Sequence, residues 1–330
     1  MDQFRVCRMS LKSQTIIVLF GILMIVLGCG ENQSKTAKGT IGITVMSLSN
    51  PYFKELAEAA QEEALKFGFE VIIASGDFDP SKQRNQISDF ITKDVDAIIL
   101  TPVDSKSSGV SVRKCNEMGI PVFTADLATE DSLANVVAHI ATDNYMGGRQ
   151  AGDAMIEAIK TRNKKIMILD FPQAESCVKR IAGFRDRIGE YNLANPLDQF
   201  NIVTQLPCGG QRDIAFKATS DVIQAHPDLV GIFAINDPGA LGAVGALEKV
   251  NRLDDITIIG FDGQPEGKVA IRDGKVYADP IQFPKRIGRQ TVQTIMKYLN
   301  GHEVEKTQLI ETALYRQEDG LNDPDMKDYR

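Results

Sequence analysis

Short apolar runs and longer amphipathic segments alternate along the chain from Gly42 onward. The short runs are rich in branched residues, as in strands buried on both faces, and the segments between them have helical spacing. This alternation predicts an α/β fold, in which helices cover parallel sheets. In the first half we expect strands at residues 41–46, 71–74, 97–100, 122–125 and 136–141, and helices beginning near Tyr52, Ser81, Ser107 and Tyr145.

The first predicted helix carries a regular apolar stripe. Its apolar residues recur every three or four positions, which places them on one buried face. The stripe consists of Phe53, Leu56, Ala57, Ala60, Ala64 and Phe67. Gly68 follows directly, so the helix is expected to end there.

The second half of the chain repeats the plan of the first. Strands are expected at residues 165–169, 200–205, 231–235, 256–261 and 277–281, followed by a helix at 287–299 and a final strand near 307–314. The repetition predicts two similar doubly wound domains. The last helix is needed to cover the first sheet, so the chain should cross between the domains more than once, through a hinge of several strands.

The N-terminal segment has the order of a secretory leader: basic residues, an apolar run and then small residues. The apolar run at residues 16–27 is shorter than the roughly 20 residues that a spanning helix needs. It closes on Val-Leu-Gly-Cys, so we expect residues 1–28 to be removed and Cys29 to be acylated, for example with palmitate. The alternative is an uncleaved anchor in which Cys29 is incidental. Residues 29–40 are polar and should form a flexible tether.

Charge argues against a nucleic-acid partner. Loss of residues 1–28 removes three basic residues and one acidic residue, and it changes the formal charge from −7 to −9. Lysine and arginine are interspersed along the chain with no basic block of the kind that binds a phosphate backbone. Residues 318–330 are expected to be a disordered acidic tail.

Polar residues follow several of the predicted strands, at the end of a parallel sheet where ligands bind. Ser49-Asn50-Pro51-Tyr52-Phe53 follows the first strand, and Asp126, Asn236 and Asp262 each close another. A carboxylate accepts hydrogen bonds from two adjacent hydroxyls, and aromatic rings pack against the C–H faces of sugars. The sequence therefore favours a neutral sugar or polyol as ligand.

Each of these residues also has a purely structural interpretation. Asn50 is suited to cap a helix that Pro51 begins, and Phe53 to lie in the core. Asp126 and Asp262 could be simple loop caps. In the sequence Asn236-Asp237-Pro238 we assign the capping role to Asp237 and the ligand role to Asn236.

Signatures of catalysis, metal binding and cofactor binding are weak. The histidines at positions 139, 226 and 302 have no partner at metal-ligand spacing. The glycines at 239, 242 and 245 have the wrong spacing for a dinucleotide fingerprint, and no phosphate-binding loop motif is present. We expect a protein without cofactor, metal or catalytic activity, although a glycosidase that uses two carboxylates is an alternative.

Seven motifs from Ile41 to about Gln317 carry a resemblance to a known family. They are SLSNPYF, DAIILTPVD, IPVFTAD, HIATDNYMGG, AHPDLVGIFAINDPGALGA, IIGFDGQPEG and YADPIQFP. In this order they resemble the ribose-type periplasmic sugar-binding proteins, the extracytoplasmic components of ABC importers. The resemblance implies a monomer with two domains, joined by three crossing strands, that close over a monosaccharide and present it to a membrane permease. It assigns residues 41–142 and 283–310 to the N-terminal domain, and residues 143–282 and 311–317 to the C-terminal domain.

The resemblance also implies a set of ligand residues. By position these are Asn50, Tyr52, Phe53, Asp126, Asn236, Asp262 and Gln282, with Met46, Phe171, Gln173 and Val178 around them. The chain departs from ribose-binding relatives at Leu127 and Val178, where they have arginine, and at Gly210, where they have an aromatic residue. Loss of two guanidinium groups would remove rigid hydrogen-bond donors, so ribose itself is not the expected ligand.

Two further questions stay open at the level of sequence. Cys177 and Cys208 fall in loops that would flank the ligand, so they form either a disulfide or two buried thiols, whereas Cys115 has the pattern of a buried helix residue. The same fold could serve a periplasmic sensor that passes its closed state to a membrane receptor. A repressor with this core would begin with a helix-turn-helix rather than a leader.

Overall fold

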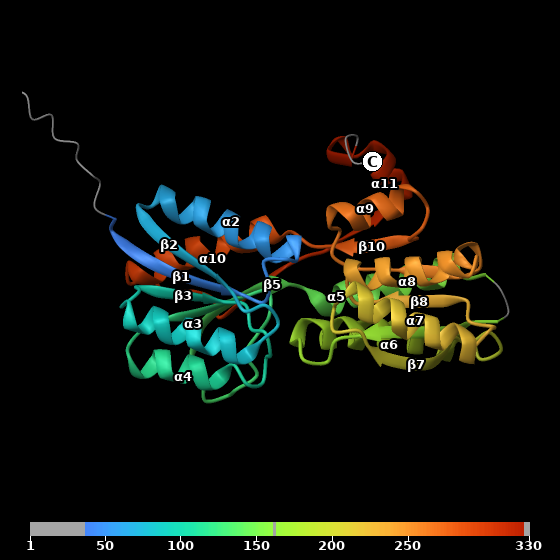
Figure 1. The fold of residues 1–330 in the computed structure, drawn as a ribbon, viewed down its shortest axis with the longest axis horizontal. Helices are drawn as coiled ribbons and strands as arrows, with labels where there is room; N and C mark the ends of the chain where they lie inside the picture. Colours follow the sequence, from blue (N-terminus) through green and yellow to red (C-terminus); the bar gives the residue numbers. More distant parts are fainter. Residues whose placement is uncertain (1–36, 161–162, 327–330) are drawn as a thin grey trace, which may run out of the picture. The chain divides into compact units, whose positions relative to one another are not determined.

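The computed structural model describes residues 37–160 and 163–326 (Figure 1). The leader, Cys29 and most of the tether lie outside the described residues. Within the described part, no helix is both long enough and apolar enough to span a bilayer.

Two sheets of six strands organise the described residues. The first, with its helices, is called the N-lobe, and the second, with its helices, the C-lobe. In spatial order the N-lobe strands are β11 (Thr307–Ile310), β5 (Val136–Thr142), β4 (Val122–Ala125), β3 (Ala97–Leu100), β1 (Gly39–Val45) and β2 (Phe69–Ser75). The C-lobe strands are β12 (Ala313–Arg316), β10 (Ala278–Ile281), β9 (Thr257–Ile259), β8 (Gly231–Ala234), β6 (Lys165–Asp170) and β7 (Asn201–Pro207). Neighbouring strands are parallel except for β12, which runs antiparallel to β10.

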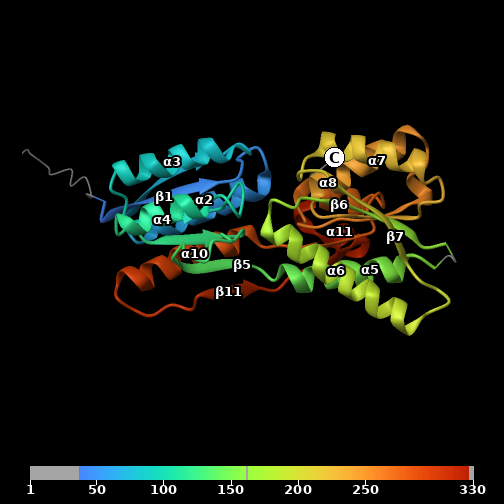
Figure 2. The ribbon, with the colours of Figure 1, turned by 90° about the horizontal axis from the view of Figure 1, so that it is seen from below.

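Helices cover both faces of each sheet (Figures 1 and 2). The N-lobe contains α2 (Pro51–Lys66), α3 (Pro80–Thr92), α4 (Gly109–Glu117) and α10 (Pro284–Leu299). The C-lobe contains α5 (Asn144–Ala158), α6 (Glu175–Ala194), α7 (Arg212–Ala225), α8 (Asp237–Lys249), α9 (Pro265–Arg272) and α11 (Gln317–Asn322). Two 3₁₀ turns, at Leu253–Asp255 and Pro324–Met326, complete the described structure. The predicted α/β fold class is confirmed.

The core of the N-lobe follows the two-residue period of its strands. Ile99 of β3 packs in the cluster that contains α2 and α10, whereas Ile98 and Leu100 pack in the cluster that contains α3 and α4. Successive side chains of a strand point to opposite faces, so a strand that is apolar throughout fills both layers. This is why the continuous apolar runs of the sequence identify the strands so well.

The chain passes between the two sheets at three places. It does so after β5, after β10 and between β11 and β12. The expected final strand near residues 307–314 is in fact two short strands, β11 in the N-lobe sheet and β12 in the C-lobe sheet. Glu311 and Thr312 connect them. The carboxyl end of β10 therefore leads directly into the N-lobe.

Two local predictions are wrong. Phe67 is 38% exposed and caps the end of α2 instead of joining its buried stripe. Gly68 has φ +84 and ends the helix as expected. The acidic tail is not wholly irregular, since residues 317–322 form α11. Asp323 accepts hydrogen bonds from Lys268 Nζ at 3.0 Å and Tyr315 Oη at 2.9 Å, which hold this segment on the C-lobe.

Candidate ligand-binding site

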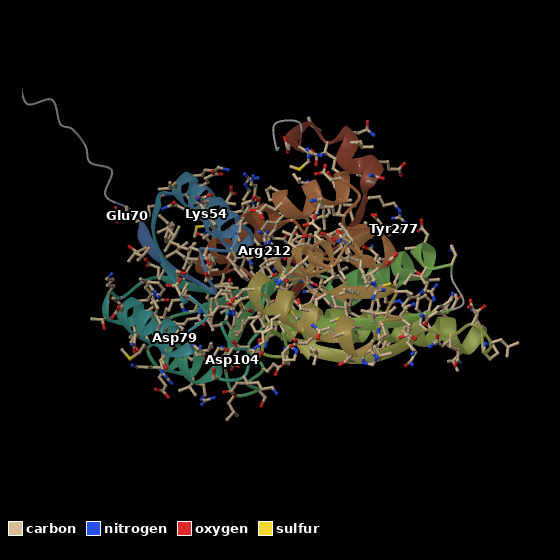
Figure 3. The ribbon with its side chains drawn as sticks, turned by 45° about the vertical axis from the view of Figure 1, so that its right-hand side comes forward. Lys54, Glu70, Asp79, Asp104, Arg212 and Tyr277 are labelled. Atoms are coloured by element: carbon tan, nitrogen blue, oxygen red, sulfur yellow. The ribbon has the colours of Figure 1, made fainter. Side chains whose placement is uncertain are left out.

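A cavity lies where the carboxyl ends of strands from both lobes meet. Its N-lobe wall consists of Met46, Asn50, Tyr52, Phe53, Phe78, Asp126 and Leu127. Its C-lobe wall consists of Phe171, Ala174, Ser176, Cys177, Arg180, Gly210, Asn236 and Asp262, and Gln282 joins it from the segment between β10 and α10. A wider groove with charged sides adjoins the cavity and shares Asn50, Phe78 and Gly210 with it. Lys54 and Arg212, both labelled in Figure 3, line that groove.

The structure brings together most of the residues that the sequence singled out. All seven principal candidates line the cavity, as do Met46 and Phe171. Gln173 does not line it: its side chain is exposed and its backbone carbonyl accepts a hydrogen bond from Ser105 N at 3.2 Å. Val178 also lies outside, with 45% of its surface exposed.

Arg180 is a cavity residue that the sequence analysis missed. It is 3% exposed, and its Nη1 donates to Asp262 Oδ1 at 3.0 Å and to the Ile235 carbonyl at 2.6 Å. Its Nε donates to Asn144 Oδ1 at 2.8 Å, and the guanidinium carbon lies 3.9 Å from the centre of the Phe261 ring. The expectation that the C-lobe had lost its arginine, with Val178 in its place, is therefore wrong.

Helical periodicity explains the difference between Val178 and Arg180. Residues 177, 180, 181 and 184 recur at spacings of three and four, and all are buried on one face of α6. Position 178 falls on another face. The buried pattern of this helix was thus the sequence signal that could have identified Arg180.

Close packing of α5 and α6 fixes the position of Arg180. A Cβ atom added to Gly148 would lie 2.0 Å from the Arg180 carbonyl oxygen, and one added to Gly183 would lie 2.0 Å from the Tyr145 carbonyl oxygen. Neither position has room for a side chain. The two glycines let the helix backbones approach each other, which places the guanidinium beneath the cavity.

A hydrogen-bond network joins the two lobes along the side of the cavity next to Gln282. The Tyr52 hydroxyl lies 2.7 Å from Asp126 Oδ1 and 3.1 Å from Gln282 Oε1. Gln282 Oε1 also accepts from Thr142 Oγ1 at 2.6 Å, and its Nε2 donates to Asp262 Oδ1 at 2.5 Å. The side chain of Gln282 therefore connects the N-lobe carboxylate to the C-lobe carboxylate, and does more than bond to the backbone.

Burial changes the ionisation of the carboxyl groups in this network. Loss of hydration raises the pKa of Asp126 to about 7, although Arg180 and the Tyr52 hydroxyl oppose the change. Burial also raises the pKa of Asp262, against the opposing effect of the Arg180 charge. Both residues have positive φ, 68° and 109° respectively, which is unusual for a residue with a side chain. Both residues follow the carboxyl end of a strand, and in this backbone conformation their side chains line the cavity.

The two asparagines of the site are helix caps as well as cavity residues. Asn50 Oδ1 accepts from Tyr52 N at 3.0 Å, as the capping interpretation predicted. Asn236 Oδ1 accepts from Gly239 N at 2.9 Å, and its Nδ2 donates to the Gly210 carbonyl at 3.2 Å. The assignment of the cap to Asp237 is therefore wrong, because Asn236 performs that role.

Asp237 instead belongs to a buried pair of carboxyl groups beside the site. Its Oδ2 accepts from Gln264 N at 2.5 Å, and its carboxyl group faces that of Asp279 on β10. Asp237 is 1% exposed and Asp279 is fully buried. Burial raises the pKa of Asp279 to about 6, and burial together with the neighbouring Asp279 raises that of Asp237 well above its usual range. A shared proton would let the two groups hydrogen-bond to each other.

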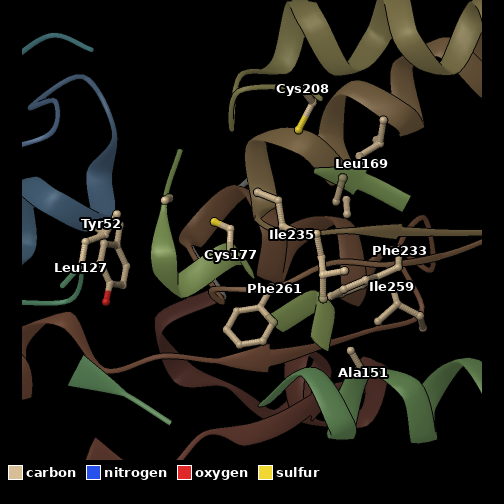
Figure 4. Close-up of a cluster of buried hydrophobic side chains, with 14 of the residues drawn as sticks. Tyr52, Leu127, Ala151, Leu169, Cys177, Cys208, Phe233, Ile235, Ile259 and Phe261 are labelled. Atoms are coloured by element: carbon tan, nitrogen blue, oxygen red, sulfur yellow. The ribbon is translucent and has the colours of Figure 1, made fainter. Parts of the chain in front are cut away.

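The cysteines of the C-lobe are free, so the disulfide option is wrong in this structure. Cys177 lines the cavity, whereas Cys208 is fully buried in the core, and they come from different segments (Figure 4). Burial raises the pKa of Cys177 to about 12 and that of Cys208 to about 11. Cys115 is buried in α4, as predicted. The described residues contain no group of three or more side chains placed to hold a metal ion.

Comparison with known proteins gives consistent matches over most of the chain. Residues 41–303 match the family model described as "Periplasmic binding protein domain". The ribose import binding protein RbsB of Escherichia coli is 31% identical over 281 residues, which is 85% of this chain and 92% of RbsB. A solute-binding protein of an ABC transporter from Mycobacterium smegmatis, solved with bound glycerol, is 30% identical with a TM-score of 0.79, and the match covers 87% of this chain and 96% of that one. A second ABC transporter solute-binding protein, from Agrobacterium vitis and solved with bound D-fucose, is 28% identical with a TM-score of 0.79. The match covers 88% of this chain and 99% of that one.

Proposed function

The chain belongs to the periplasmic binding protein family, and we propose that it captures a neutral monosaccharide or polyol outside the cytoplasm for an ABC importer. The predicted resemblance to ribose-type binding proteins is confirmed by the RbsB match. Because its relatives are binding proteins of import systems, the chain is a binding protein rather than a glycosidase.

One observation carries the proposal: the cavity receives hydrogen-bonding groups from both lobes. Asp126 comes from the N-lobe, and Arg180 and Asp262 come from the C-lobe. Within the described residues, Arg180 Nη2 has no hydrogen-bond partner and is free to donate to a ligand. One guanidinium between two carboxyl groups leaves no excess of positive charge, which favours a neutral hydroxylated ligand over an anion.

Closure of the lobes over the ligand is part of the proposed mechanism. Groups that come from different lobes surround a ligand completely only when the lobes are together, so binding favours the closed state. The three crossings near Thr142, Gln282 and Glu311 are the places where such a hinge would bend. The closed form would then be recognised by the permease.

The proposed function is tested by a thermal-shift screen of the protein against pentoses, hexoses, deoxy sugars and polyols. A ligand that binds only the folded protein adds about 2.7 kcal/mol to the free energy of unfolding at a hundredfold excess over its dissociation constant. We expect a stereoselective increase in melting temperature and recovery of the sugar unchanged. A flat response across the panel would contradict the proposal.

A lipid anchor at Cys29 is the second part of the proposal and rests on the leader motif. The Cys29→Ser variant lacks the thiol that would be acylated, so it should appear in the aqueous phase after detergent phase separation of whole cells. The unaltered protein should appear in the detergent phase. Equal partition of the two proteins would show that Cys29 does not anchor the chain.

A further inference from the structure

The walls of the cavity differ in chemistry, and the difference narrows the class of ligand. We propose that the ligand is a deoxygenated sugar or polyol, with a methyl or methylene group where the parent compound has a hydroxyl, and that this group lies against Leu127, Ala174 and Cys177. The inference rests on the proposed function, because it names the ligand class of the same site.

One wall of the cavity is polar and lies beside Gln282. The Tyr52 hydroxyl, Asp126, Gln282, Asp262 and Arg180 form a continuous set of hydrogen bonds there. All five side chains are buried. A ligand hydroxyl placed on this wall would find charged partners on both lobes.

The other wall lies where the loops of the two lobes touch each other. Ser105 of the N-lobe donates its N–H to the Gln173 carbonyl at 3.2 Å, and its Oγ accepts from Glu175 N at 3.3 Å. Ala174 lies between these two C-lobe residues. The Ser105 carbonyl accepts from Glu130 N at 2.8 Å, which ties the loop that carries Leu127 to the same place. The loop that carries Leu127 and the 173–177 segment therefore meet at Ser105, and both contribute side chains to the cavity.

The side chains on this flank offer little to a hydroxyl group. Leu127 is 2% exposed and Ala174 1% exposed, and both belong to the hydrophobic core. Cys177 contributes a thiol, which is a weak donor and a weak acceptor. Ser176 also lines the cavity and is the polar exception on this flank; its hydroxyl donates to the Cys177 sulfur at 3.9 Å. In Figure 4, Leu127 and Cys177 come from opposite lobes.

Burial of a hydroxyl against Leu127 and Ala174 removes its water without providing a hydrogen-bond partner. A methyl group at the same place has no hydrogen bonds to water to lose, and its burial against apolar side chains is favourable. We therefore expect the deoxy compound of a matched pair to bind roughly 10- to 100-fold more tightly than its hydroxylated parent. The polar wall would still select the stereochemistry of the remaining hydroxyls.

Calorimetry on the full chain with matched pairs tests the inference. The pairs are D-fucose with D-galactose, L-rhamnose with L-mannose, 6-deoxy-D-glucose with D-glucose, and 2-deoxy-D-ribose with D-ribose. The expected result is at least one pair in which the deoxy member binds more than tenfold more tightly. Parents that bind as tightly as their deoxy partners in every pair would overturn the inference and leave the proposed function standing. Absence of binding by every sugar would overturn both.

Two variants link the preference to the apolar wall. Leu127→Asn places an amide on that wall and should reduce or reverse the preference for the deoxy sugar. Cys177→Ser changes only one atom on the opposite lobe and should act in the same direction, so the test does not depend on one variant folding. Leu133→Asn, at a 78% exposed residue later in the same loop as Leu127, is the control and should keep the preference. A preference that both cavity variants leave unchanged would contradict the assignment of the wall.

Discussion

Replacement of Arg180 by methionine is expected to abolish detectable sugar binding and to lower the free energy of unfolding by about 3–5 kcal/mol. Arg180 is 3% exposed and forms a 3.0 Å ion pair with Asp262. Methionine would retain much of the apolar contact with Phe261, but Asp262 would be left as a buried carboxyl group without its cation. The pKa of Asp262, already raised by burial, should rise further. Chemical denaturation and calorimetry with the best ligand measure the two effects.

Arg185→Met on the same helix provides the matched control. Arg185 is exposed and donates to Gln205 Oε1 at 2.6 Å, away from the cavity, so its loss should change stability by less than about 1 kcal/mol. The double variant Arg180→Met, Asp262→Asn removes the unpaired charge and should recover part of the stability but none of the binding. Wild-type affinity in Arg180→Met would show that the guanidinium does not contact the ligand.

Replacement of Asp279 by asparagine is expected to make the protein more stable at neutral pH and to flatten the dependence of its stability on pH. The pKa of Asp279 is about 6 in the folded protein, above its ordinary value of 3.8, so the folded state holds a proton that the unfolded chain releases. This contribution to stability is complete below about pH 4 and is lost as pH rises through about 6. A difference of this size corresponds to a free energy on the order of 3 kcal/mol. Asparagine stays neutral and can still donate to Asp237.

Melting temperatures measured from pH 4 to pH 8 test this expectation. The wild-type protein should lose stability between pH 4 and pH 6, and Asp279→Asn should lose less over that interval because one of the buried carboxyl groups has been removed. Asp126, with its pKa of about 7, should lower the stability of both proteins as pH rises from about 4 to about 7. Asp254→Asn, at an exposed position of the same lobe, should follow the wild-type curve. Parallel curves for wild type and Asp279→Asn would contradict a shared proton.

The fold could be predicted from the sequence because its strands are buried on both faces. Runs such as Ala97–Leu100 contain only apolar residues and have no competing helical period, so they can be recognised as strands from the sequence alone. The candidate site followed from the same pattern, since Asp126, Asn236 and Asp262 stand directly after such runs. For these residues, their position in the sequence directly after a strand was enough to predict that they lie at the site.

The residues that were misassigned depend on contacts between distant segments. Arg180 lies inside α6, several residues from the end of any strand. The helical period places it on the buried face of α6, but its contacts with Asn144, Ile235 and Asp262 are what show that this part of the face borders the cavity. Asp237 is followed by proline, as many caps are, yet its role is set by Asp279, which comes 42 positions later in the chain. No local pattern around Asp237 contains that information.

The described residues contain three cysteines, one in the N-lobe at position 115 and two in the C-lobe at positions 177 and 208, all free and buried. A thiol in such a place reacts with an alkylating reagent only when the surrounding structure opens. Cys115 therefore reports the opening of the N-lobe core, Cys208 that of the C-lobe core, and Cys177 that of the cavity. Mass spectrometry after timed alkylation would give three local stabilities from the wild-type sequence, without a fluorescent label or a tryptophan.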